Sequence, residues 1–249
     1  MSSATGIPAH YPDEPRENEP LLGRPGDVTQ DEETSIISNL WLGTGWISLV
    51  GAILLALSIW LSVFLHPLLP LVSPHPLLNS LGILALTLAI QILQPTWSPS
   101  TKRRGQIAHA SLNLFSFLCF TAGATIILVN KHRSSDPHPH FHSAHAYLGL
   151  TSVAVLVLQY AIGLSMWAFP AVYGGEERAK KVWKYHRMAG YVIYLLLLGT
   201  VIAATYTPYA SKVLELKTWS VAVAAGLCVV GVYPRASLTK LGLRRENPQ

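Results

Sequence analysis

A single histidine stands near the start of residues 182–206, VWKYHRMAGYVIYLLLLGTVIAATY, and a long apolar stretch comes after it. The same arrangement, a histidine at the start of a long apolar stretch, occurs three times earlier in the chain. The four histidines are His75, His109, His145 and His186, and the intervals between them are similar in length. Each interval can hold one bilayer-spanning helix of about 20 residues and a connection. The repetition predicts a bundle of transmembrane helices with a histidine near the start of each.

Six apolar stretches in all are long enough to cross a bilayer. The predicted spans are residues 41–65, 76–93, 106–129, 144–169, 182–206 and 218–233. Proline and glycine residues separate several of them, and tryptophans and tyrosines gather near their ends, as at membrane interfaces. We therefore expect an all-α membrane protein of six transmembrane helices, in which helices 2–5 form a core four-helix bundle.

The charges divide the chain into three parts. Only 12% of the residues are charged, whereas soluble domains have about a quarter. Eight acids and two arginines lie within residues 1–40, and the rest of the chain is basic. We expect a disordered acidic tail at 1–39, a transmembrane domain at 40–235 and a basic tail at 236–249. Because the basic residues cluster at the membrane edges, they indicate no nucleic-acid partner.

The distribution of Lys and Arg predicts the orientation. The side that carries the C-terminus and the connections after the second and fourth spans holds 12 of these residues, or 14 with the N-terminal tail. The opposite side holds four. By the positive-inside rule both termini are then cytosolic. His109 and His186 would lie near the cytosol, and His75 and His145 near the lumen or exterior.

Histidines inside spans are costly, which favours a functional role over simple tolerance at an interface. Successive spans alternate in direction, so His75 can pair with His145 and His109 with His186. One turn after each histidine the same helix face carries an Asn or a Gly, namely Asn79, Asn113, Gly149 and Gly190. An Asn can tune a ligand, and a Gly lets a flat macrocycle approach the backbone, although ordinary helix packing also explains the glycines.

Two such pairs could hold two haems, one above the other. A haem with two axial imidazoles has no open position for oxygen chemistry, so its role is electron transfer. The histidines therefore predict a transmembrane electron conduit.

Four short segments resemble the signatures of the cytochrome b561 family. They are HPLL at 75–78, His109 after KRRG at 102–105, HAYLG at 145–149 and YHRMAG at 185–190. The resemblance covers roughly residues 40–235 and is closer to the short, divergent members. It implies two b haems per chain, with His75, His145, His109 and His186 as axial ligands of the iron. It also implies ascorbate or a related enediol as cytosolic donor, and monodehydroascorbate or a ferric chelate as acceptor.

A cytosolic anion requires basic side chains near the cytosolic haem. The candidates are Lys184, Arg187, Arg104, Arg103 and Lys102, which can form charge-assisted hydrogen bonds with an enediolate. Lys184 and Arg187 flank His186 and are preferred. Many members of the family have a basic residue two or three positions before the third-helix ligand, where this chain has Ile107 and Gln106.

Other interpretations stay open at this point. A His-lined metal or proton carrier would use the same histidines, and the histidine-rich segment 130–143 could bind metal. Residues 17–22, ENEPLL, match an acidic dileucine sorting signal, which favours an endomembrane location such as vacuole, lysosome or endosome over the plasma membrane. The expected partners are the donor, the acceptor and the lipid bilayer, and a homodimer stays open.

Overall fold

The computed structural model describes residues 28–135, 142–238 and 240–241, and within them all regular structure is helical. Six helices are long and apolar enough to cross a membrane, which confirms the six predicted spans. They are α1 (Gly45–Phe64), α2 (Pro74–Leu93), α3 (Pro99–His132), α4 (Ala144–Ala168), α5 (Glu176–Ala204) and α6 (Thr218–Val232). Short helical turns η1 (Ile36–Leu40), η2 (Pro170–Tyr173), η3 (Tyr209–Val213) and η4 (Tyr233–Arg235) flank or connect them.

Two helices begin earlier than the apolar pattern predicts. At α3, Ser98 and Thr101 form a capping box and Pro99 occupies the first turn, so the helix starts there rather than at residue 106. At α5, Gly174 and Gly175 have φ angles of 81° and 109°, and the helix starts directly after them. The basic residues that we expected in these two connections therefore lie on helices.

The first span begins later than expected. Trp41 caps the end of η1 and does not start the spanning helix, because Gly43 takes a left-handed conformation with φ 58°. This turn separates η1 from α1.

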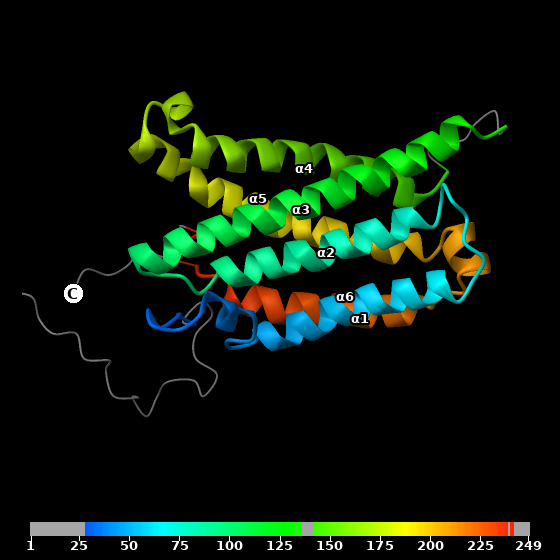
Figure 1. The fold of residues 1–249 in the computed structure, drawn as a ribbon, viewed down its shortest axis with the longest axis horizontal. Helices are drawn as coiled ribbons and strands as arrows, with labels where there is room; N and C mark the ends of the chain where they lie inside the picture. Colours follow the sequence, from blue (N-terminus) through cyan, green and yellow to red (C-terminus); the bar gives the residue numbers. More distant parts are fainter. Residues whose placement is uncertain (1–27, 136–141, 239, 242–249) are drawn as a thin grey trace, which may run out of the picture.

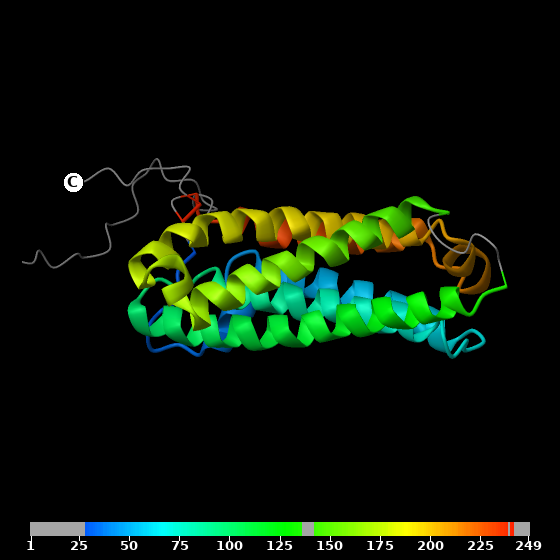
Figure 2. The same cartoon turned by 90° about the horizontal axis from the view of Figure 1, so that it is seen from above.

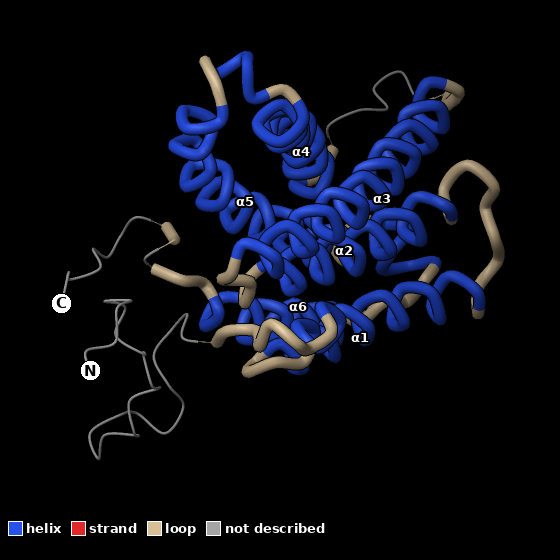
Figure 3. Tube along the Cα trace, turned by 60° about the vertical axis from the view of Figure 1, so that its left-hand side comes forward, coloured by secondary structure: helices blue, strands red, loops and turns tan. Residues whose placement is uncertain are grey.

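The six helices form three antiparallel pairs, α1 with α6, α2 with α3 and α4 with α5 (Figure 1). Figure 2 shows the same rods from above, with α4 crossing the bundle obliquely. In Figure 3 the pairs α2/α3 and α4/α5 lie on one side, and α1 and α6 cover the other. The four histidine-bearing helices thus lie together, and the first and last described residues lie at one end of the bundle.

The hydrophobic core lies between α1, α2, α5 and α6, not at the centre of the histidine-bearing helices. Its central side chain, Tyr194, is fully buried, and its hydroxyl lies 2.8 Å from the Thr87 hydroxyl. By contrast, only 6% of the most apolar stretch of α4 is buried within the protein, compared with 44% of the corresponding stretch of α2. Helix α4 therefore has little protein packed against its faces.

Close packing of α1 on α6 depends on glycine. A Cβ at Gly231 would overlap the backbone and side chain of Ser48, whereas a Cβ at Gly226 would meet nothing within 4 Å. The hydroxyl of Thr44 donates to the Gly231 carbonyl at 2.8 Å, which holds the two helix ends together.

We predict that Gly231→Ala destabilises the protein by about 1–3 kcal/mol, because the added methyl overpacks the α1–α6 contact. Thermal unfolding of the purified protein in detergent measures the effect. Gly226→Ala is the matched control on the same helix and should leave the unfolding temperature unchanged or slightly raised, because alanine favours a helix more than glycine does. Equal unfolding temperatures for the two variants would contradict this account of the packing.

Candidate haem sites and basic pocket

The four histidines occupy equivalent places on their helices. His75 and His145 are the second residues of α2 and α4, and His109 and His186 are the eleventh residues of α3 and α5. The His75 and His145 rings lie face to edge with their centres 6.0 Å apart. His109 and His186 hold the same position on two parallel helices, near the other end of the bundle. The structure thus brings the rings of the first predicted pair together and places the second pair at the opposite level.

Three of the four imidazoles are oriented in the same way. Nδ1 of His75 lies 2.9 Å from the carbonyl oxygen of Gly123, that of His109 lies 2.9 Å from the oxygen of Ala89, and that of His145 lies 2.9 Å from the oxygen of Thr200. In each case the carbonyl belongs to the antiparallel neighbour, α2 with α3 or α4 with α5. A carbonyl can only accept, so Nδ1 carries the proton and the Nε2 lone pair is left for a metal.

On three helices the same number of residues separates the histidine from the carbonyl that accepts a hydrogen bond at the other level. On α2 the interval runs from His75 to Ala89, on α3 from His109 to Gly123, and on α5 from His186 to Thr200. This interval makes about four helical turns, so both positions share a face, and it spans about 21 Å along the axis. Each of these helices therefore supplies a histidine to one level and an acceptor to the other.

The fourth helix departs from this pattern. At the same interval after His145 stands Gln159, whose Nε2 donates to the carbonyl of His186 at 2.7 Å. Nδ1 of His186 is buried without a hydrogen-bond partner among the described residues. An unpaired buried polar atom costs about 1–3 kcal/mol, and His186 differs from the other three histidines in that no neighbouring carbonyl orients its Nδ1.

The His75 and His145 rings are near enough for both to ligate one metal, because a metal–nitrogen bond to an imidazole is about 2 Å long and the ring centres lie 6.0 Å apart. A Cβ at Gly149 would meet nothing within 4 Å, so the inner turn of α4 leaves room for a flat group.

The other residues one turn after the histidines behave differently. A Cβ at Gly190 would lie 3.2 Å from Nε2 of Gln159, so this glycine faces a side chain. Asn79 donates to the carbonyl of His75 at 2.7 Å, as Asn113 does to the carbonyl of His109 at 2.8 Å, and Nδ2 of Asn79 also lies 3.0 Å from Nδ1 of His75. Gly163, which the sequence pattern did not single out, lies against the His186 ring.

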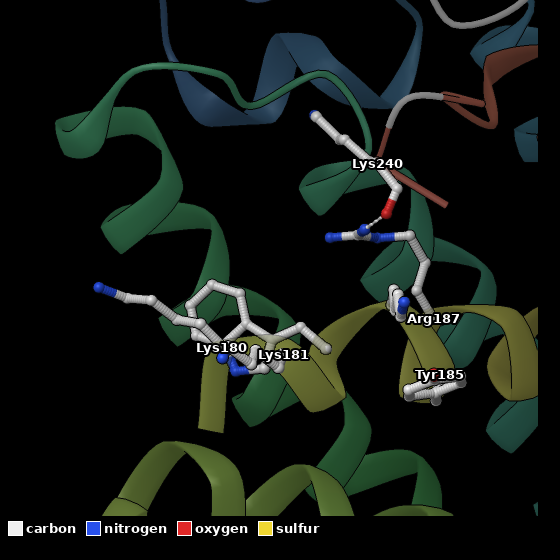
Figure 4. A pocket seen from close by; sticks show the side chains of 7 residues that line it. Lys180, Lys181, Tyr185, Arg187 and Lys240 are labelled. Carbon is white, nitrogen blue, oxygen red and sulfur yellow. Dashed lines mark hydrogen bonds between the residues drawn. The ribbon is translucent and has the colours of Figure 1, made fainter. Parts of the chain in front are cut away.

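A basic pocket of about 510 Å³ opens beside His186 (Figure 4). Its size is typical of small-molecule sites. The lining residues are Lys180, Lys181, Trp183, Lys184, Tyr185, Arg187 and Lys240. None of them is acidic, and the lining presents five cations and two aromatic rings, which is the composition expected of a site for an anion.

The cations of this pocket differ in their surroundings. Lys180 has carboxylate partners, Glu176 at 3.2 Å and Glu177 at 3.8 Å. Lys184 lies over the ring of Tyr185 at 4.8 Å. Burial, followed by repulsion from Arg187 and Lys102, lowers the pKa of Lys240 to about 8. Positive charge that is held at such a cost favours an anionic occupant, because an anion would offset the repulsion.

The five predicted substrate residues divide into two groups. Lys184 and Arg187 line the pocket, as expected from their places beside His186. Lys102, Arg103 and Arg104 are exposed on the first turns of α3 and are not part of its lining. Arg104 donates to the carbonyl of Glu32 at 3.1 Å, and Arg103 lies 5.8 Å from the centre of the Trp167 ring.

The pocket also contains residues that the sequence did not indicate. Lys180 and Lys181 belong to the basic run before His186, and helical spacing could have placed them with Lys184. No local pattern connects Lys240 with this run, because 53 residues separate it from Arg187.

Two sequence hypotheses fall largely outside the described residues. Residues 17–22, the sorting motif, are not described, and neither are His138 and His140 of the histidine-rich segment. His132 and His142 are described and exposed. Within the described ranges no three His, Cys, Asp or Glu side chains are grouped as a metal site.

Comparison with known proteins places these features in one family. The profile described as eukaryotic cytochrome b561 matches residues 74–211, which include all four histidines. The chain belongs to the cytochrome b561 family. The match also confirms the resemblance of the short sequence signatures, and haem b is the cofactor that the family implies.

Three curated relatives illustrate the similarity. The chain is 28% identical to the plasma membrane ascorbate-dependent reductase of Xenopus tropicalis over 143 residues, 56% of this chain and 47% of that protein. It is 24% identical to the transmembrane ascorbate-dependent reductase of Bos taurus over 129 residues, 51% and 49% of the two chains. It is 26% identical to the lysosomal membrane ascorbate-dependent ferrireductase of Mus musculus over 98 residues, 39% and 40% of the two. The chain thus spans about half the length, or less, of these relatives.

We predict that Gly163→Ala lowers haem binding at the His109/His186 level, because the new Cβ would lie 2.8 Å from Cε1 of His186. Haem per chain and the visible spectrum of the purified protein measure the effect. Gly199→Ala on α5, where a Cβ would meet nothing within 4 Å, is the control and should keep full haem content. Full haem content with an unchanged spectrum in both variants would show that Gly163 does not position this imidazole.

Proposed function

We propose that this protein is a di-haem transmembrane oxidoreductase of the cytochrome b561 type. It takes electrons from ascorbate, or a similar enediol, on the cytosolic side and delivers them to monodehydroascorbate or ferric iron on the other. His75 and His145 would hold one haem, and His109 and His186 the other. The observation that carries the proposal is the repeated alignment of an imidazole Nδ1 with a carbonyl of the neighbouring helix, at two levels of the bundle.

Haem b held between two imidazoles supplies reversible one-electron transfer. The protein contributes orientation and environment. The carbonyls of Gly123, Ala89 and Thr200 retain the proton at Nδ1, fix the ring plane and make the other nitrogen a better donor.

The basic pocket is the proposed donor site. Ascorbate is an anion at neutral pH, and Lys184 and Arg187 can bind its enediolate oxygens through charge-assisted hydrogen bonds. In each turnover the ascorbate anion loses one electron and one hydroxyl proton, and becomes monodehydroascorbate. On the opposite side, ferric iron takes one electron, or monodehydroascorbate takes one electron and one proton.

The position of this pocket is consistent with the proposed orientation. It lies at the end of the bundle that carries the C-terminal segment, the end that the distribution of Lys and Arg assigns to the cytosol. The relatives include plasma membrane and lysosomal proteins, and their names support an ascorbate-dependent reductase as the general class. An endomembrane location for this chain is a proposal that rests on the sorting motif.

The deciding experiment is an optical spectrum of the purified protein, first oxidised and then mixed with ascorbate, together with a haem count. We expect two low-spin haems per chain and rapid reduction. His109→Ala and His186→Ala should each lose the same haem, and His75→Ala and His145→Ala the other. Absence of haem would overturn the proposal in favour of a His-lined carrier. Reduction by dithionite alone would remove ascorbate as the donor.

We also predict that Arg187→Gln raises KM for ascorbate about tenfold or more, the loss expected for one hydrogen bond to a charged group. Initial rates of haem reduction at several ascorbate concentrations measure it. Lys212→Gln removes an equal charge from η3, near the end of α2 that carries His75, and should leave KM unchanged. A similar KM for both variants would exclude Arg187 from the donor site.

A further inference from the structure

The C-terminal segment reaches back over the end of α2 through one side chain. Nζ of Lys240 donates to the carbonyl of Gln94 at 3.0 Å and to that of Thr96 at 2.6 Å. Gln94 caps α2, and Thr96 lies just beyond it. The last carbonyls of a helix have no partner within it and carry the negative end of its dipole, so a cation there is favourable.

The backbone of the same residue contacts the donor pocket. Nη1 of Arg187 donates to the carbonyl of Lys240 (Figure 4). Among the described residues the guanidinium has no carboxylate within ion-pair distance, so this carbonyl is the acceptor that holds it. Lys240 therefore connects the end of α2 to the arginine that directly follows His186.

The side chain and the backbone of Lys240 therefore have different roles. The ammonium group fixes the segment in place, and the carbonyl that is thereby held sets the position of the guanidinium. An arginine side chain loses much rotamer freedom when it is fixed, so an arginine positioned in advance binds an anion at a lower entropic cost.

We propose that Lys240 is a positioning residue of the donor pocket, which orients Arg187 toward an anionic enediol from the C-terminal segment. The proposal rests on the proposed function, because it takes the pocket as the ascorbate site. It is not a property of the matched family region, since Lys240 lies beyond residues 74–211.

The surroundings of Lys240 support a fixed side chain. Its pKa is lowered to about 8 by burial and by the nearby charges of Arg187 and Lys102, as expected of an amine enclosed by protein rather than extended into water. Ser237, three residues earlier, presents its hydroxyl oxygen 3.4 Å from the Lys240 backbone N–H, which closes the turn locally.

The test is a pair of double-mutant cycles on the full-length protein. One combines Lys240→Met with Arg187→Gln, and the other combines Lys181→Met with Arg187→Gln. Lys181 is the matched comparison, because its loss removes the same charge from the same pocket without releasing the segment. KM and kcat for ascorbate are measured, and so is ascorbate affinity by calorimetry on dithionite-reduced protein, in which no turnover occurs.

We expect Lys240→Met to weaken ascorbate binding about tenfold, with little change in kcat and an unchanged haem spectrum. In the Arg187→Gln background Lys240→Met should have a much smaller effect, whereas Lys181→Met should act additively. Lys240→Arg, which keeps a cation for the carbonyls, should restore most of the affinity. If Lys240→Met loses haem, Lys240→Gln replaces it in the cycle.

Equal losses for Lys240→Met and Lys181→Met, both additive with Arg187→Gln, would overturn the proposal and leave Lys240 as one charge among five. Ascorbate binding and reduction by the wild-type protein test the proposed function itself. If the wild-type protein binds ascorbate without being reduced by it, the electron-transfer proposal fails, and the calorimetric cycles still decide the role of Lys240. If it binds no ascorbate, both proposals fail.

Discussion

The hydrogen bond from an imidazole Nδ1 to a backbone carbonyl of the neighbouring helix is the contact on which the rest of this bundle depends. It is repeated at 2.9 Å for His75, His109 and His145. Each bond joins two helices, sets a ring plane and leaves one nitrogen directed elsewhere. Helices α2, α3 and α5 each carry a histidine and an acceptor carbonyl on the same face. A helix that places its histidine correctly at one level therefore also places its carbonyl correctly at the other.

This constraint explains where the protein is well packed and where it is not. The tight contacts lie between α1, α2, α5 and α6, with Tyr194 fully buried at their centre. Helix α4 is the exception among the histidine-bearing helices, because little of its surface is covered by other helices. Such a division would suit the proposed haems, since space that holds a flat group cannot also be filled with side chains. The firm α1–α6 side then supports the other.

The basic pocket at the end of the bundle is formed by a helix extension and the C-terminal segment. Helices α3 and α5 both continue beyond the apolar spans, and on α5 this extension places a run of cations one to two turns before His186. The C-terminal segment adds Lys240 from the opposite side and joins the end of α2 to Arg187. A donor bound there, as proposed above, would lie next to His186, so binding and electron entry would occur at neighbouring residues.

Hydropathy, chain direction and spacing were enough to predict the six spans, the order of the four histidines and their division into two levels, because these are local or periodic properties. That Lys184 and Arg187 lie beside His186 was also predictable, since both flank it in the sequence. The starts of α3 and α5 were misplaced, because a capping box begins α3 and two glycines with positive φ precede α5, in both cases before the apolar region. Three features required the folded chain: the carbonyl that each imidazole faces, the contact of Gly163 rather than Gly190 with His186, and the place of Lys240 in the pocket. Hydropathy fixes the depth of a residue in the membrane, whereas packing and hydrogen bonds between distant residues fix the rotation and neighbours of each helix, and no local pattern encodes them.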